Sequence, residues 1–401
     1  MQTFDGISNR LTLSLALLLT IWIFSGCDDT PVVGGDLSPD DASVKADTVL
    51  LDDTSIISTP SFSGNRQYVT TGSVDDPAIG QLFATAMLRP SIDREEGADS
   101  IGPGAAASIA LSPDYFYGME AEPASYHIVE IERRWRSSSW RYDSIPELGH
   151  SVVAEFTLTD SDSIVVPLDQ QWADKYREIF MTESDAVRDS LYEAEMHGLA
   201  IVPADDNGKM FSFEPSQAEL LFETADGEGG ISQEFRRWAV SLEKDLTFSN
   251  DADGSRLVFN TMRHMLELDI EFTEEFLGTN NFSRVELVMY KDTVSMQQDV
   301  PSTFLRPGSE TMRVYQLEDE QLDFAITADP TFQSNIRSED NSFRFNLTNL
   351  VNERLHLNSD SRKLYGVIGA NDGRVFPHII SGKNDPGRSP KLLITSFSKD
   401  Q

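Results

Sequence analysis

Side chains that commonly carry catalysis follow no established motif in this chain of 401 residues. The six histidines include no HExxH pair or other metal-ligand spacing, so a zinc site is disfavoured. No GxSxG nucleophile elbow occurs, and Ser241-Leu242-Glu243-Lys244 fits only the short pattern SxxK, which arises readily by chance. We therefore predict no catalytic residues and a protein that is not an enzyme.

Acidic turns are the remaining candidates for holding a cation. Residues 250–254 (NDADG) begin like a calcium-binding loop, with Asp251 and Asp253 as candidate ligands. Gly254 comes too early for such a loop, however, and no glutamate stands at its twelfth position. The similar turns at 205–208 (DDNG) and 371–373 (NDG) are first of all hairpin turns. The sequence therefore predicts no firm metal site and no cofactor, with Ca²⁺ as the one candidate ion.

Four tryptophans are candidates for contacts with sugars, because an exposed indole ring on a β-sheet can stack on a sugar ring. The alternative role is packing in the core or at its rim, which is common for large aromatic side chains. Exposure of the rings distinguishes the two roles. The four candidates are Trp135, Trp140, Trp172 and Trp238.

The N-terminal residues carry a signal for export. Residues 11–24 (LTLSLALLLTIWIF) contain no charge and no proline, as in the apolar region of a signal peptide. A transmembrane helix needs roughly 20 apolar residues, so this run is too short to span a bilayer. The next residues, Phe24-Ser25-Gly26-Cys27, resemble the lipobox of bacterial lipoproteins. This resemblance implies cleavage before Cys27, acylation of its thiol and anchoring to a membrane through the lipid.

Cys27 is the only cysteine, so the processed chain forms no intramolecular disulfide and depends on core burial for stability. Asp28 and Asp29 follow it directly, which suggests surface display, although aspartate at this place can instead signal retention in the inner membrane. We expect an exported, lipid-anchored protein, with the outer membrane or cell surface favoured over the inner membrane. The alternative is an ordinary cleaved signal peptide with a cysteine there by chance.

The charge balance excludes some partners. The chain has 32 basic and 66 acidic residues, a net charge of -34. Nucleic acid is disfavoured as a partner because no basic stripe is present to replace the counterions of phosphates. Attraction to anionic lipid headgroups is disfavoured for the same reason. A hydrophobic content of 39% with 23 phenylalanines indicates a folded chain.

Composition shifts divide the chain into four parts. Residues 1–26 are the lipoprotein signal peptide, and 27–48, rich in Asp, Pro and Gly, form a flexible acidic tether. Residues 49–226 and 231–399 form two domains, separated by the sequence ADGEGG at 225–230.

Alternating apolar residues, as in Ile164-Val165-Val166-Pro167-Leu168 and at 266–270, predict half-buried strands. The expected fold is mainly all-β, with two tandem antiparallel β-sandwiches of jelly-roll type. One helix, at 182–196, is inserted in the first domain.

The two predicted domains share an internal similarity. Five segments of the first match five segments of the second in the same order, at separations of 168 to 186 residues. The separation falls from 179 to 168 residues across the predicted helix, as an insertion in the first copy requires. The pattern indicates a duplication. The matched segments are 108–111 with 284–287, 126–132 with 312–318, 163–168 with 342–347, 198–199 and the turn 206–208 with 366–367 and the turn 371–373, and 218–222 with 390–394.

Several segments are similar to the DNRLRE-type β-sandwich module, and the body from about residue 48 to 398 looks like a large family of uncharacterised surface lipoproteins classed as a domain of unknown function. The resemblance implies tandem β-sandwiches and brings no functional residues. The segments that carry it are 263–270 (RHMLELDI), 281–290 (NFSRVELVMY), 389–395 (SPKLLIT), the tryptophan pair in 135–140 (WRSSSW) and 75–80 (DDPAIG).

We therefore expect a non-catalytic envelope or surface lipoprotein that contacts the bilayer through acylated Cys27 and binds a glycan or an envelope protein. Two alternatives stay open. A carbohydrate-active hydrolase would need two cleft-lining carboxyl groups about 5 to 9.5 Å apart, a separation that sequence does not give. A purely structural spacer would have no cleft and no exposed aromatic cluster.

Overall fold

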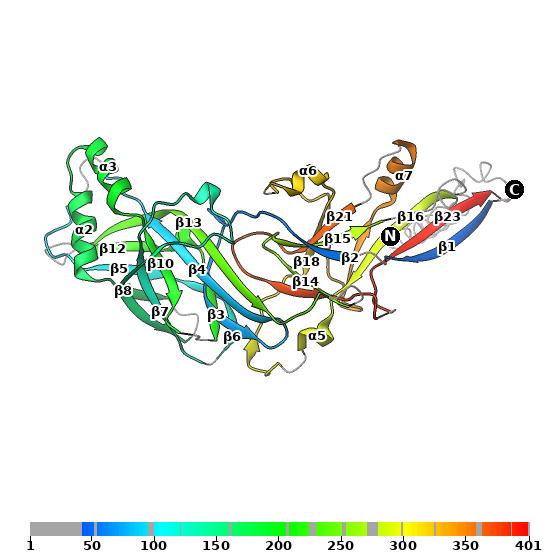
Figure 1. The fold of residues 1–401 in the computed structure, drawn as a ribbon, viewed down its shortest axis with the longest axis horizontal. Coiled ribbons are helices and arrows are strands. Elements are labelled where there is room, and N and C mark those ends of the chain that lie inside the picture. Colours follow the sequence, from blue (N-terminus) through cyan, green and yellow to red (C-terminus); the bar gives the residue numbers. More distant parts are fainter. Residues whose placement is uncertain are drawn as a thin grey trace, which may run out of the picture.

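Antiparallel β-strands make up most of the structure, a computed structural model that is elongated along one axis (Figure 1). None of the helices in the described part of the chain is long and apolar enough to cross a membrane. The described residues are 42–51, 54–94, 100–120, 122–159, 163–205, 208–223, 230–250, 254–270, 280–297, 300–324, 326–357, 363–385 and 387–399.

The strands β3 to β13 form what we call the N-terminal half. They are β3 (Val69–Asp76), β4 (Gly80–Pro90), β5 (Ala107–Leu111), β6 (Pro113–Met119), β7 (Ala124–Ile131), β8 (Leu148–Leu158), β9 (Ile164–Pro167), β10 (Leu199–Pro203), β11 (Lys209–Phe213), β12 (Glu219–Glu223) and β13 (Gly230–Leu246). The long strand β13 pairs first with β12 and then with β4, and it thereby joins two groups of strands into one sheet.

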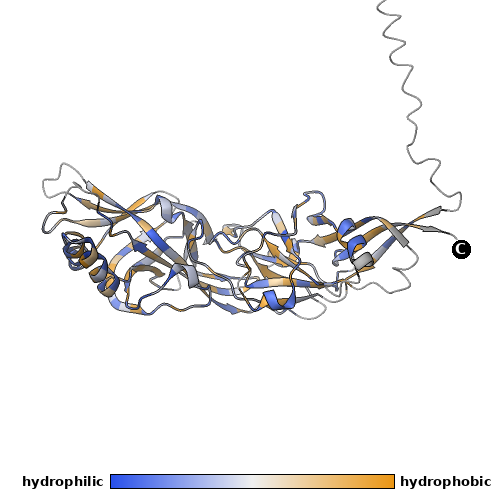
Figure 2. Ribbon diagram, turned by 90° about the horizontal axis from the view of Figure 1, so that it is seen from above, coloured by the Kyte–Doolittle hydropathy of each residue, from blue (hydrophilic) through white to orange (hydrophobic). Residues whose placement is uncertain are grey.

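The remaining strands form what we call the C-terminal half, which includes the first two strands of the described chain. They are β1 (Ala42–Leu50), β2 (Thr54–Ser58), β14 (Arg256–Phe259), β15 (His264–Asp269), β16 (Asn280–Tyr290), β17 (Phe304–Leu305), β18 (Thr311–Tyr315), β19 (Phe332–Asn335), β20 (Ser342–Asn346), β21 (Lys363–Ile368), β22 (Pro377–Ile380) and β23 (Lys391–Lys399). Hydrophobic and hydrophilic residues alternate along strands of both halves (Figure 2).

The two halves pair their strands in the same order. β5 lies between β12 and β9, as β16 lies between β23 and β20. β10 lies between β7 and β4, as β21 lies between β18 and β15. β11 pairs with β3, as β22 pairs with β14. Each of the five sequence matches therefore falls on strands that have equivalent neighbours.

Helices lie between the strands: α2 (Gln170–Phe180), α3 (Asp185–Glu195), α5 (Thr293–Gln297), α6 (Asp319–Leu322) and α7 (Thr348–Leu357), with 3-10 turns η2 (Ser137–Ser139) and η3 (Pro215–Gln217). The helix predicted at 182–196 is present as α3. The preceding helix, α2, was missed. Asp169 caps α2 by accepting hydrogen bonds from the first amides of the helix, and Trp172, Tyr176 and Phe180 form its buried face at a spacing of four residues.

The predicted tether ends earlier than expected, because residues 42–48 belong to β1, which pairs with β23 along its whole length. The side chains from Val44 to Thr48 are exposed, so this strand has no apolar alternation by which the sequence could reveal it. Its place in the sheet matches that of the first part of β13 beside β12. β1 therefore completes the C-terminal half.

The predicted boundary at 225–230 also differs from the structure. β12 and β13 pair directly on either side of residues 224–229, which themselves lie outside the described residues. Because β13 continues along β4 to Leu246, the N-terminal half extends beyond the predicted boundary. The Gly-rich composition that suggested a linker is equally typical of a tight connection between paired strands.

The junction between the halves is packed and polar. The main core of the N-terminal half also contains Leu257, Phe259 and Val375 from the C-terminal half. Asp76 is fully buried and holds Arg306 through two hydrogen bonds of 2.6 Å. β17 adds to the edge of β6. The halves therefore share core residues, an ion pair and a sheet.

Candidate functional site

Several predicted site residues cannot be placed. Cys27 and the lipobox residues Phe24, Ser25 and Gly26 lie outside the described residues. The candidate calcium ligands Asp251 and Asp253 lie outside them as well. Within the described ranges, no group of three or more His, Cys, Asp or Glu side chains is arranged to hold a metal ion.

The four tryptophans do not form a stacking platform. Trp135 and Trp172 are 4% exposed and pack in the cores, so their rings cannot meet a sugar. Trp140 is half-buried and meets Trp135 edge to face at 6.0 Å, with its indole N–H bonded to Ser241. The half-buried Trp238 donates its indole N–H to the carbonyl of Arg66. The tryptophan candidates therefore serve mainly in packing, since a large apolar ring gains most from burial.

The SxxK pattern is not a catalytic arrangement here. Ser241 and Lys244 lie on strand β13, where residues three apart point to opposite faces of the sheet. Ser241 is buried and accepts a hydrogen bond from Trp140, while the Lys244 ammonium lies 4.8 Å above the ring of Phe259. The two side chains therefore have separate surroundings.

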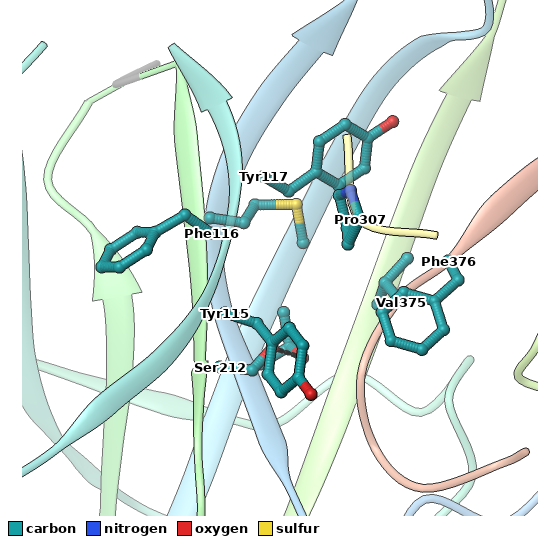
Figure 3. Close-up of a pocket in the computed structure, with 9 residues that line it drawn as sticks. Tyr115, Phe116, Tyr117, Ser212, Pro307, Val375 and Phe376 are labelled. Atoms are coloured by element: carbon teal, nitrogen blue, oxygen red, sulfur yellow. Dashed lines mark hydrogen bonds between the residues drawn. The ribbon is translucent and has the colours of Figure 1, made fainter. Parts of the chain in front are cut away.

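A narrow cavity lies at the junction of the halves. Tyr115 and Tyr117 of β6 line it together with Pro307 and Phe376 (Figure 3). Its volume of about 10 Å³ is room for roughly one water molecule. Beside it the guanidinium of Arg374 lies within 4.6 Å of the rings of Tyr115 and Phe376. Because the chain's own arginine already fills the space between the aromatic rings, this region serves the junction and offers no room for a ligand.

A larger pocket, of about 330 Å³, lies beside α3. We call it the arginine pocket. Its volume is within the range of small-molecule sites. Helix α3, which forms one wall of the pocket, lies with α2 at the end of the body far from β1 and β23 (Figure 1). The lining residues of the pocket are Arg89, Pro90, Ser91, Ile92, Asp93, Asp189, Tyr192, Glu193, Arg236 and Arg237.

Backbone pairing explains how two consecutive arginines line one pocket. In a regular strand, Arg236 and Arg237 would point to opposite faces. The register between β13 and β4 shifts here, with Phe235 opposite Pro90 and Arg237 opposite Arg89, so Arg236 is the extra residue of a bulge. Bulges redirect side chains in this way and are common next to functional sites. The bulge therefore lets both arginines line the pocket.

Arg89 is the fixed base of the arginine pocket. Its side chain is 2% exposed, and its guanidinium donates to the carbonyls of Tyr192 and Met196 and to the Glu193 carboxylate. The guanidinium also lies 4.4 Å above the ring of Tyr192. Tyr192 in turn donates its hydroxyl hydrogen bond to the carbonyl of Pro90. These contacts tie the end of β4 to α3 and hold the pocket wall rigid.

Three arginines surround the Glu193 carboxylate. Arg89 lies at 2.9 Å, Arg134 at 2.9 Å and Arg237 at 3.1 Å. Burial alone would raise the pKa of Glu193, but these guanidinium groups outweigh it and lower the pKa. Glu193 is therefore ionised at neutral pH, and one carboxylate faces three positive charges. It also separates Arg89 from Arg237, whose positions directly opposite each other on paired strands would otherwise be unfavourable.

The pocket also has acceptor groups. Asp93 pairs with Arg236 and accepts a hydrogen bond from the Ser91 hydroxyl. Asp189 is exposed and forms no hydrogen bond or ion pair with other described residues. Sequence reasoning missed this site. Its signal was the occurrence of two arginine doublets, 133–134 and 236–237, in a chain where acidic residues outnumber basic ones by 66 to 32.

Comparisons with known proteins add little to this description. No family model matches the chain, and no curated protein matches it. A solved structure of the Macrobrachium rosenbergii nodavirus aligns over 90% of this chain and 91% of that chain, with 9% identity and a TM-score of 0.11. A likeness at that TM-score carries no argument about the fold or the function.

Proposed function

We propose that this protein is a non-catalytic, lipid-anchored protein of the bacterial cell envelope that displays a ligand-binding pocket at the end of an elongated β body, away from the membrane. The ligand is a glycan or a partner protein. One observation carries the proposal: the arginine pocket and β1, the strand that follows the predicted anchor, lie at opposite ends of the body (Figure 1).

The position of β1 supports an anchor at that end. Residues 28–41 join the predicted lipid site at Cys27 to Ala42, which pairs with Lys399 near the C-terminus. A lipid on Cys27 would therefore hold the C-terminal half toward the membrane. The N-terminal half, with the arginine pocket, would face outward.

We interpret the two halves as copies of one jelly-roll-like β-sandwich. The five sequence matches and the shared order of strand pairing support a duplication. Among the described residues, one helix, α7, lies between β20 and β21, whereas α2 and α3 both lie between β9 and β10. The duplication would lengthen the body, while α3 of the first copy forms one wall of the pocket.

The hydrolase alternative has less support. A glycosidase needs one carboxyl group that stays protonated to act as the general acid. In the arginine pocket the pKa of Glu193 is lowered by its three arginines, which suits a fixed negative charge and not a proton donor. Binding without catalysis is therefore the function that this geometry favours.

Replacement of the predicted anchor tests the proposal. Cys27→Ser should abolish labelling by radioactive palmitate and release the protein from the membrane fraction, because no other thiol is present. The double variant Cys27→Ser/Ser43→Cys is a matched control that restores a thiol outside the lipobox, and it should also stay unlabelled. Labelling that persists in Cys27→Ser would refute the anchor.

A further inference from the structure

We propose that the arginine pocket binds a sugar acid, a polyhydroxylated monoanion whose carboxylate contacts Arg236 and Arg237 and whose hydroxyl groups donate to Asp93 and Asp189. This inference rests on the proposed function and names the ligand class of its pocket. It follows from the unused donors, the unused acceptors and the charge balance of the site.

The unused donors belong to the outer arginines. A guanidinium has five N–H groups in a planar fork that matches a carboxylate. Among the described residues, Arg237 donates only through Nη1 to Glu193, and its side chain is 42% exposed. Arg236, which is 61% exposed, pairs only with Asp93 through Nη1. Most N–H groups of both arginines are therefore available to an incoming anion.

The pocket already holds one carboxylate in the manner proposed for the ligand. The two carboxylate oxygens of Glu193 form ion pairs with the guanidinium groups of Arg89, Arg134 and Arg237. Arg89 is buried and bonded to two backbone carbonyls, so it fixes Glu193, and Glu193 holds Arg237 before any ligand enters. Such preorganisation reduces the cost of ordering side chains on binding.

The charge balance selects a monoanion. The pocket lining holds three guanidinium groups, those of Arg89, Arg236 and Arg237, and three carboxylates, those of Glu193, Asp93 and Asp189. Arg134 pairs with Glu193 from outside the lining and brings the balance to one surplus positive charge. One added negative charge neutralises this surplus, whereas a phosphate dianion would be repelled by the three carboxylates. A neutral sugar would leave the surplus in place.

The acceptors select a hydroxylated ligand. Asp189 is exposed and unpaired among the described residues, and Asp93 keeps one oxygen, Oδ1, without a described partner. Ionised carboxylates only accept hydrogen bonds, so they suit the hydroxyl groups of a sugar ring. A small molecule that carries both a carboxylate and several hydroxyl groups is a hexuronic acid or a similar sugar acid.

Calorimetry on the mature protein tests the proposal with four probes: galacturonic acid, the matching neutral sugar galactose, galactose 6-phosphate and alanine. We expect galacturonic acid alone to bind, more weakly as salt rises. Arg237→Gln should weaken its affinity roughly tenfold or more, because charge-assisted hydrogen bonds are lost. Arg133→Gln is the matched control, since Arg133 is 81% exposed and does not line the pocket. The Arg133→Gln variant should bind the uronic acid with the affinity of the wild type.

A second variant separates binding from folding. Asp189→Asn replaces a carboxylate without described partners by a neutral amide, so the fold should persist while affinity for the uronic acid falls several-fold. The proposal is overturned if the neutral sugar, the phosphate or alanine binds as tightly as the uronic acid, if none of the probes binds, or if both pocket variants bind like the wild type. None of these binding results tests the predicted lipid anchor, because lipid labelling of Cys27 is measured in a separate experiment.

Discussion

At the scale of single residues, one buried cation gives the protein a pH response. Lys244 lies above the ring of Phe259, and its buried ammonium has no hydrogen-bond partner among the described residues. Burial and, to a lesser extent, Arg263 lower the pKa of Lys244 to about 7, while Asp143 acts in the opposite direction. The contribution of Lys244 to the free energy of unfolding therefore depends on pH.

Removal of Lys244 tests this response. In the unfolded chain a lysine keeps its proton up to a pKa of about 10.4. The unfolded state therefore binds more protons between pH 7 and 10.4, and Lys244 makes stability rise with pH through that window. Lys244→Met should stabilise the protein by roughly 2 to 4 kcal/mol at pH 7, and the gain should fade near pH 10.

Urea denaturation at pH 7 and pH 10 measures the difference between the variant and the wild type. Lys45→Met, at an exposed site on β1, is the control and should change stability little at either pH. An equal gain for Lys244→Met at both pH values would contradict the lowered pKa.

At the scale of elements, β1 shows that a strand can form without an apolar pattern of its own. Residues 42–50 pair with 391–399 along nine positions, which satisfies the backbone groups at the edge of β23. Among the β1 side chains that the structure describes, only Val49 packs against the core of the C-terminal half, whereas Val44 is 65% exposed. β1 is therefore held by its backbone and by the residues at its C-terminal end.

Two substitutions on the same strand test whether β1 is docked. Val49→Asp places a charge against the core and should destabilise the protein by about 1 to 3 kcal/mol. Val44→Asp, the matched control at an exposed position, should change stability by less than about 0.5 kcal/mol. Urea denaturation compares the two. Equal and small effects would mean that residues 42–50 behave as part of a tether.

At the scale of the whole molecule, the junction couples the two halves. Arg306 of the C-terminal half is 11% exposed and donates two hydrogen bonds to Asp76, which also accepts the hydroxyl of Tyr117. The loop before β22 contributes Val375 to the core of the N-terminal half. A shared core and a buried ion pair favour unfolding of both halves in one cooperative transition.

Asp76→Asn tests this coupling. The substitution leaves the buried Arg306 without its counter-charge and should destabilise the protein by about 3 to 5 kcal/mol. Asp75→Asn, next to it on the exposed face of β3, should have little effect. Thermal unfolding followed by near-ultraviolet circular dichroism should show one transition in the wild type and both variants, lowered only in Asp76→Asn. Two separate transitions in the wild type would contradict the coupling.

The sequence by itself determined the features that local patterns control. Alternation at 164–168 and 266–270 predicted half-buried strands, and the structure confirms β9 and β15 there, in a mainly β chain. The helix predicted at 182–196 is confirmed as α3, which spans Asp185–Glu195. The lipid anchor at Cys27 and the ligand class are predictions that await their experiments.

The tertiary structure alone decided the features that depend on partners distant in the chain. Residues 42–48 of the predicted tether form a strand because they pair with β23. Strand β13 continues past the predicted boundary because it pairs with β4. The arginine pocket depends on a bulge at Arg236 and on Glu193 from a helix more than forty residues away in sequence. Local periodicity carries no information about such pairing, because backbone hydrogen bonds between strands are the same for every side chain.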